Sequence, residues 1–290
     1  MVRSKVLCAV LVASLGVFAH AAGQQAVLPK IDRMYVFGDS YSDIGEGYVD
    51  GNGPTAVAYL AERLGSFKLL PSNTPEVRGK SLDYAVSGAQ SGSGTGRRVQ
   101  GALLGYGMKN QVADFAAKVR SHEIEFDPAT TLFFLAGGLN DGRLPDGTTA
   151  ANEKDEIRTL YGLGARRFAV ALLTTAIPGF GVTGRRINPS LERIPEELRG
   201  ELKDAQIRLS HWGLFYDEVL LHPAQYGITN TTDACAGREI YHEDPTPCAK
   251  PETYFYYHSA HPSTAAHKAV GDKLYGELTG DTVQAATTRQ

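Results

Sequence analysis

Apolar runs of strand length alternate with amphipathic helical segments along most of this 290-residue chain, and no other feature restricts its fold as strongly. The strand-like runs are RMYVFGD (33–39), SLDYAVSGA (81–89), TTLFFLAGG (130–138) and RRFAVALLTT (166–175). The helical segments between them are 53–65, 109–121 and 152–165. Such alternation is typical of βαβ units, in which a parallel sheet is covered by helices on both faces. The sequence therefore predicts an α/β fold.

The first 21 residues have the pattern of a secretory signal peptide. Arg3 and Lys5 precede an apolar run over 6–18, and the run is followed by Ala19-His20-Ala21, a small-x-small cleavage site. The apolar run is too short for a membrane span, although a membrane anchor is the alternative. We expect cleavage after Ala21, a single domain over 22–290 with a frayed tail at 281–290, no transmembrane segment, and a secreted or periplasmic location.

Charge and cysteine content narrow the class of protein further. The formal charge of −3 becomes −5 after cleavage, because Arg3 and Lys5 are lost and residues 1–21 contain no acid. A mildly acidic chain without a basic run argues against nucleic-acid binding. Cleavage also removes Cys8, so Cys235 and Cys248 remain, and we expect a disulfide that closes CAGREIYHEDPTPC. Two free thiols are the alternative, and a lone cysteine pair is a poor zinc site.

The strand at 33–39 ends abruptly on Gly38-Asp39-Ser40. These residues favour an ordinary turn, but open α/β sheets also place reactive groups at the carboxyl ends of their strands. Gly88 and Asn140 follow later strands in the same way, in SGAQSG and GGLND, and His261 stands near the C-terminus in HSAHP. A serine hydroxyl needs a base to remove its proton, and the developing oxyanion needs fixed donors. Together these residues are the components of an acyl-transfer site.

In order and spacing, FGDSYSD, SGA, GGLND and HSAHP resemble the four blocks of the GDSL esterases and lipases, also called SGNH hydrolases. The segment HPAQYGITNTTDAC is similar to secreted members described as phospholipase, lecithinase or hemolysin relatives. The resemblance, over about residues 33–272, implies a three-layer α/β/α sandwich around a five-stranded parallel sheet. It implies Ser40 as the nucleophile and His261 as the base. The oxyanion hole would consist of the Ser40 and Gly88 N–H groups and the Asn140 side chain.

One position departs from the family pattern in a way that affects the mechanism. The family has an acid three residues before the histidine, whereas this chain has His258. Three interpretations follow: a Ser-His dyad whose His261 is oriented by a backbone carbonyl, a carboxylate from elsewhere such as Asp244 or Glu243, or a weakened enzyme. A carbonyl can fix the histidine tautomer, which is much of what the acid does. His258 is a further candidate for an orienting group. Tyr41 also replaces the leucine of the family motif, and we expect this to matter less.

We therefore expect a serine esterase without a metal or other cofactor, which cleaves lipid or short-chain carboxylic esters through an acyl-enzyme. A carbohydrate O-deacetylase of the same fold and a non-catalytic surface protein are the alternatives. The pair His258 and His261 could bind a metal, but the sequence offers no third ligand.

Overall fold

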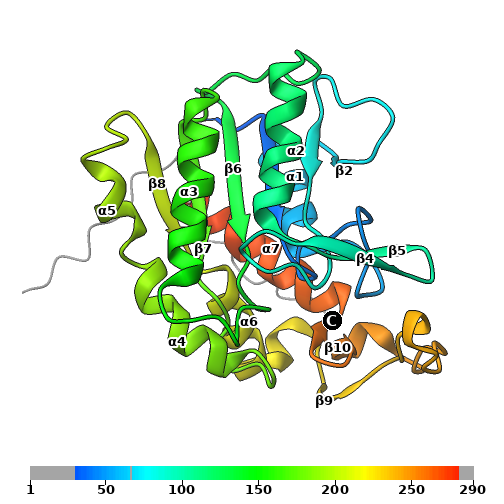
Figure 1. The fold of residues 1–290 in the computed structure, drawn as a ribbon. Helices are drawn as coiled ribbons and strands as arrows, with labels where there is room; N and C mark the ends of the chain where they lie inside the picture. The colour runs from blue at the N-terminus through cyan, green and yellow to red at the C-terminus, as the bar shows by residue number, and fades with distance from the viewer. Residues whose placement is uncertain (1–29, 66, 281–290) are drawn as a thin grey trace, which may run out of the picture.

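A parallel sheet between two layers of helices organises the protein (Figure 1), seen in a computed structural model that describes residues 30–65 and 67–280. The expected signal peptide and the tail over 281–290 lie outside the described residues. The strand order is β2-β3-β1-β6-β7-β8, and every pair of neighbours is parallel. The strands are β1 (Arg33–Gly38), β2 (Leu69–Pro71), β3 (Ser81–Asp83), β6 (Thr131–Ala136), β7 (Arg167–Ala171) and β8 (Gln206–Ser210). The predicted α/β class is confirmed.

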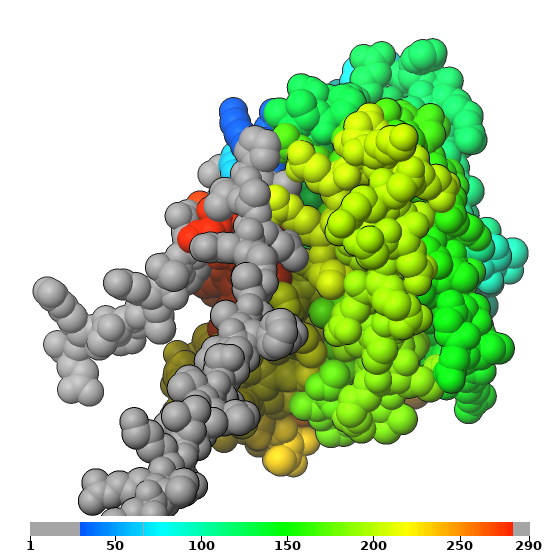
Figure 2. Space-filling model, turned by 90° about the vertical axis from the view of Figure 1, so that its left-hand side faces the viewer, coloured from blue at the N-terminus to red at the C-terminus, as the bar shows by residue number. Residues whose placement is uncertain are grey.

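Helices cover both faces of this sheet. They are α1 (Ala56–Gly65), α2 (Met108–Arg120), α3 (Thr148–Gly162), α4 (Gly181–Leu191), α5 (Ile194–Arg199), α6 (Trp212–Leu221) and α7 (Thr264–Thr279). Helices α2 and α3 lie together on one face, whereas α7 packs against α1 and α6 on the other (Figure 1). Figure 2 views the molecule from the β8 edge, where α5 lies beside that strand. The three-layer arrangement is therefore as expected.

The described sheet has six strands, not the expected five. The additional strand is β2, a three-residue edge strand that pairs with β3 through Leu69, Leu70 and Pro71. Two apolar residues before a proline give no strand signal by themselves, because proline in a sheet is confined to edges and ends. Pairing with β3 supplies what the local sequence lacks.

The central strands form the middle of the core. From Met34 to Phe37 the side chains of β1 are fully buried, and Phe133, Phe134 and Leu135 of β6 are buried beside them. A central parallel strand has both faces covered, which explains why these runs are continuously apolar. The burial makes β1 and β6 rigid supports for the residues that follow them.

The remaining elements stand outside the main sheet. They are a hairpin of β4 (Thr95–Val99) and β5 (Ala102–Tyr106), a small sheet of β9 (Asn230–Ala234), β10 (Tyr254–His258) and β11 (His261–Pro262), and the 3₁₀ turns η1 (Pro223–Tyr226), η2 (Glu239–Tyr241) and η3 (Pro251–Thr253). The charges over residues 194–209 are spaced as on a helical face and predict a helix there, but this prediction is wrong in the second half of the segment. Helix α5 ends at Arg199 and residues from Gln206 form β8, where polar and apolar residues alternate with the period of a strand.

Candidate active site

Ser40 lies two residues beyond the end of β1, in a tightly constrained backbone. The Gln111 side chain accepts from the Gly38 N–H at 3.0 Å and donates to the Gly38 carbonyl at 2.9 Å. Gly38 must be glycine here, since a Cβ atom would lie 2.4 Å from the Ala136 carbonyl oxygen of β6. The Ser40 side chain is therefore presented from a fixed strand end, and Ser40 is only 5% exposed.

Buried acids connect the segments that follow the strands. The Asp39 carboxylate accepts from the N–H groups of Tyr41 and Leu139, both at 3.3 Å, and thereby joins the end of β1 to the end of β6. Asp141 accepts from the Ser91 N–H at 3.1 Å and from the Thr149 hydroxyl at 2.7 Å. The first of these bonds connects the segment after β3 to the segment after β6. These contacts hold three of the sequence blocks together.

His261 reaches Ser40 from the far end of the chain. Its Nε2 lies 2.9 Å from the Ser40 hydroxyl oxygen, and its Nδ1 lies 2.8 Å from the Ser259 carbonyl oxygen. The residue begins β11, which pairs with β10 so that His258 and His261 face each other across the hairpin. Because the Ser259 carbonyl can only accept, Nδ1 carries the proton and Nε2 is left free to accept the serine proton. This is the contact that the dyad interpretation expects.

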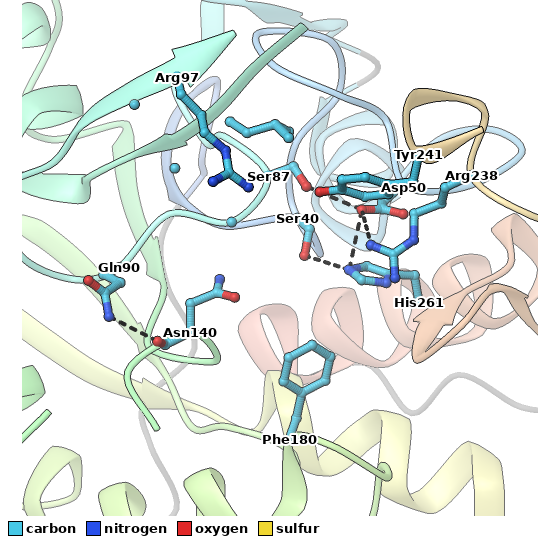
Figure 3. Close-up of a pocket in the computed structure, with 14 residues that line it drawn as sticks. Ser40, Asp50, Ser87, Gln90, Arg97, Asn140, Phe180, Arg238, Tyr241 and His261 are labelled. Carbon is cyan, nitrogen blue, oxygen red and sulfur yellow. Dashed lines mark hydrogen bonds and ion pairs between the residues drawn. The ribbon is translucent and has the colours of Figure 1, made fainter. Parts of the chain in front are cut away.

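Gly88 and Asn140 line the same cavity as Ser40 and His261 (Figure 3), which has a volume of about 530 Å³. Gly88 has a φ of +77°, a backbone conformation that residues with a side chain rarely adopt. The Asn140 amide donates to the Ala89 carbonyl at 2.9 Å. The structure therefore brings all four residues of the expected acyl-transfer site to one cavity.

The sequence candidates for an orienting acid do not reach His261. Asp244 is exposed and accepts from the Thr246 N–H at 2.9 Å, and Glu243 accepts from the Arg238 N–H at 2.7 Å. Neither lines the cavity. The interpretation in which Asp244 or Glu243 orients His261 is therefore wrong, because both carboxylates make local hydrogen bonds within their own loop.

Asp50, which the sequence analysis missed, supplies a carboxylate instead. One of its oxygens lies 3.0 Å from His258 Nδ1. The other lies 3.5 Å from His261 Nε2, and Figure 3 shows this second contact. The Ser87 hydroxyl donates to it at 3.2 Å, and Arg238 approaches it at 3.7 Å. Asp50 stands in the irregular loop between β1 and α1, where no spacing rule connects it to His261. His258 therefore contacts this carboxylate, while the orienting contact to His261 comes from Ser259.

Burial, hydrogen bonds and neighbouring charges together shift the pKa values of Asp50 and His261. Burial opposes ionisation of Asp50, but the hydrogen bond from His258 and the charges of His261 and Arg238 outweigh it, so the pKa of Asp50 is lowered. Burial lowers the pKa of His261, although Asp50 and the hydrogen bond to Ser259 act in the opposite direction. At neutral pH the histidine is thus neutral and able to accept a proton.

Tyr41 has a larger part in the site than the sequence indicated. Its ring is fully buried against His261, with 5.7 Å between the ring centroids, and its hydroxyl donates to the Ala260 carbonyl at 2.6 Å. Ala260 has a φ of +57°, in the left-handed region that favours glycine. Tyr41 therefore holds the strained turn that carries Ser259.

Cys235 and Cys248 form a disulfide, as predicted. The loop that it closes contributes Arg238 and Tyr241 to the wall of the cavity. Within 30–65 and 67–280, no group of three or more His, Cys, Asp or Glu residues is arranged to hold a metal ion. In the same part of the chain, no helix is both long and apolar enough to cross a membrane.

Comparison with known proteins identifies the family. The family model for GDSL-like lipase/acylhydrolase matches residues 34–274. The chain belongs to this family. It is 23% identical to the Arabidopsis thaliana GDSL esterase/lipase At1g29660, covering 85% of this chain and 87% of that protein, and 26% identical to GDSL esterase/lipase EXL6 of the same plant, covering 79% and 78%.

Solved structures also resemble this GDSL protein. A member of the lipolytic G-D-S-L family from Veillonella parvula covers 83% of this chain and 94% of its own, with 16% identity and a TM-score of 0.45.

Membership of the family makes the protein a hydrolase that acts on ester bonds. Its substrates are therefore esters.

Proposed function

We propose that this protein is a secreted or periplasmic serine esterase, in which Ser40 attacks a carboxylic ester and forms an acyl-enzyme with His261 as the base. The observation that carries the proposal is the distance of 2.9 Å between the Ser40 hydroxyl oxygen and His261 Nε2. A nucleophile and a base within hydrogen-bond reach, with the base held by a third group, is the arrangement that activates a serine. The Ser259 carbonyl is that third group.

The reaction proceeds by two acyl transfers, first from the ester to Ser40 and then from Ser40 to water. His261 Nε2 takes the Ser40 proton as Oγ bonds to the carbonyl carbon, and the protonated His261 then gives that proton to the departing alcohol oxygen. Water repeats the sequence on the acyl-enzyme, which releases the acid and restores the Ser40 hydroxyl. In both halves the carbonyl oxygen becomes negative and needs fixed donors. We assign this task to the N–H groups of Ser40 and Gly88 and to the Asn140 amide, which line the same cavity.

The cavity walls favour a short or polar acyl group. Charged and amide side chains from Asp50, Gln90, Arg97, Asn140 and Arg238 surround Ser40, and Phe180 and Leu104 are the large apolar side chains among the lining residues. A long alkyl chain would have to displace water from these polar groups without replacing its hydrogen bonds. We therefore expect faster hydrolysis of short-chain esters than of long-chain lipids.

The proposed location outside the cytoplasm rests on two independent features. The N-terminal sequence has the charge, apolar run and cleavage pattern of a signal peptide. The Cys235–Cys248 disulfide fits an oxidising compartment.

Covalent labelling tests the nucleophile. A fluorophosphonate probe is expected to modify Ser40, and Ser40→Ala should lose both labelling and hydrolysis of p-nitrophenyl acetate. Ser42→Ala is the matched control, because this buried hydroxyl lies two residues away and makes no hydrogen bond within the described residues. Labelling that persists in a folded Ser40→Ala variant, or a wild-type protein that is neither labelled nor active, contradicts the proposal.

A carbohydrate O-deacetylase is the second candidate, favoured by the same polar walls and by the exposed Tyr241 at the edge of the cavity. Acetylated oligosaccharides assayed beside p-nitrophenyl acetate, butyrate and palmitate separate the two. A preference for the sugar esters by a factor of about ten or more in kcat/KM would select the deacetylase. Preference for the palmitate ester would contradict the expected polar specificity.

A further inference from the structure

The buried carboxylate of Asp50 stands between two histidines, and its position differs from that of a triad acid. A triad acid accepts from the Nδ1 side of the catalytic imidazole, where it fixes the tautomer and stabilises the positive charge. In this protein the Ser259 carbonyl occupies that side of His261, at 2.8 Å. Asp50 lies instead on the Nε2 side, at 3.5 Å, which is beyond a strong hydrogen bond but close for two charges.

A backbone carbonyl can perform only part of the work of an acid. It fixes which nitrogen carries the proton, but it has no net charge to balance the imidazolium that forms when Ser40 is deprotonated. A carboxylate at 3.5 Å in a buried site provides that balance, because charges interact strongly where water is excluded. The two tasks can therefore be divided between Ser259 and Asp50.

We propose that Asp50 is the counter-charge of the His261 imidazolium and replaces the acid that the chain lacks at position 258, while Ser259 fixes the tautomer. The inference rests on the proposed function of Ser40 and His261. Asp50 stays ionised throughout: the proton moves from Ser40 Oγ to His261 Nε2 and then to the leaving alcohol, and Asp50 neither gains nor loses one. It acts through His261 and is a positioning residue.

His258 has a defined part in this arrangement. Its Nδ1–H donates to Asp50 at 3.0 Å, and its ring is stacked on Tyr48 with 6.1 Å between the centroids. Because Ser87 also donates to Asp50, at 3.2 Å, the carboxylate is held from two sides. The residue that stands where the family has its acid thus serves to place an acid from another loop.

The loop that carries Asp50 is itself organised by a buried carboxylate. Asp43 accepts from the N–H groups of Gly45, Gly47, Tyr48 and Ser87 at 2.8–3.2 Å. These bonds fold the chain after Ser40 back toward the segment that holds Gly88. Asp50 is therefore placed by the same framework that builds the rest of the site.

The effects of the other titratable groups on the pKa of His261 differ from the effect of Asp50. Arg238 and His258 oppose protonation of His261, the neutral Tyr41 packs against its ring, and His267 lies behind Tyr41, where burial lowers the pKa of His267 to about 3. Asp50 is the acid in contact with His261 among residues 30–65 and 67–280. Removing its charge should thus lower the pKa of His261.

The pH profile of kcat/KM for p-nitrophenyl acetate tests the proposal, using Asp50→Asn and Asp50→Glu. Asn keeps the shape but removes the charge, so we expect a loss of about 10²–10³-fold at pH 7 and an acidic limb displaced to lower pH by about one unit. Glu keeps the charge, and its acidic limb should stay close to that of the wild type. Asp244→Asn, an exposed acid outside the cavity, is the control and should leave the profile unchanged.

A second variant keeps the test decisive if Asp50→Asn does not fold. Arg238→Gln removes the cation that lies 3.7 Å from Asp50, so the carboxylate should stabilise the His261 imidazolium more strongly and the acidic limb should move to higher pH. An acidic limb that does not move contradicts the proposal. The rate of fluorophosphonate labelling against pH gives the same readout without turnover.

The proposal is overturned if Asp50→Asn keeps kcat/KM within about threefold, or if it loses activity equally at every pH with the limb unmoved. Failure of the proposed function is distinguishable, because a wild-type protein that neither hydrolyses the ester nor labels at Ser40 yields no profile to compare.

Discussion

A single hydrogen bond from Tyr41 connects the first sequence block to the turn that orients His261. The Ser259-Ala260 turn has a residue of positive φ, and such backbone costs about 1–3 kcal/mol unless its surroundings hold it. Tyr41 holds it by donating to the Ala260 carbonyl at 2.6 Å. The Ser259 carbonyl is the neighbouring group of the same turn, so its position relative to His261 Nδ1 depends on this contact.

Tyr41→Phe is therefore expected to lower kcat by about tenfold with little change in KM, and to destabilise the fold by about 1–3 kcal/mol because a buried acceptor loses its partner. Tyr216→Phe is the matched control. Tyr216 is also fully buried, its ring lies 5.2 Å from that of Tyr41, and its hydroxyl contacts His267 Nδ1 at 2.7 Å. Steady-state kinetics and thermal melts measure both variants, and equal losses of kcat would show that Tyr41 acts only through stability.

The sequence could predict residues whose position follows from a strand end, but not those brought in by irregular loops. Ser40 and Asn140 follow buried strands, and parallel strands end at the same edge, so their meeting was predictable. The positions of Asp50 and of the Tyr41 hydroxyl contact depend on how the loop over 43–55 and the turn at 259–260 fold back, and periodicity gives no signal for either. Asp244 and Glu243, which the sequence offers as one alternative for the orienting group, lie in the disulfide loop and do not line the cavity.

At the scale of elements, the disulfide loop forms one wall of the cavity. Its closure restricts the unfolded chain and also fixes Arg238 and Tyr241 at the cavity. The predicted strands β1, β6 and β7 were identifiable because burial on both faces makes them continuously apolar. The β4–β5 hairpin was not, since its glycine-rich sequence gives neither a strand nor a helix period.

Replacing both cysteines, as Cys235→Ser with Cys248→Ser, should lower the free energy of unfolding by about 3 kcal/mol, the value expected for a loop of this size. KM should rise because the wall becomes mobile, while labelling of Ser40 persists, since β1 and β11 are untouched. Urea unfolding and initial-rate kinetics measure the two effects, with reduced wild-type protein as the comparison. Unchanged stability and an unchanged KM would show that other contacts hold the loop.

At the scale of the whole molecule, buried acids outside the active site make stability depend on pH. Glu153 and Glu156 of α3 are buried, and their carboxylates make no hydrogen bond within the described residues. Burial raises the pKa of both well above the ordinary value. The folded protein therefore keeps protons that the unfolded chain releases. The stabilisation that comes from the two protonated carboxyl groups is complete below the unfolded pKa, about 4.3, and is lost as pH rises toward the folded pKa.

We therefore expect the melting temperature of the wild type to fall from pH 5 to pH 8, and Glu153→Gln to reduce that fall, because a neutral amide has no proton to lose. Each unit by which the folded pKa is raised corresponds to about 1.4 kcal/mol, or about 3–6 °C for a domain of roughly 150–250 residues. Asp155→Asn is the control, since Asp155 is an exposed acid of the same helix that pairs with Lys109 and Arg158. Calorimetry across this range decides the matter: a difference between Glu153→Gln and the wild type that does not grow with pH would mean that Glu153 is already ionised in the fold.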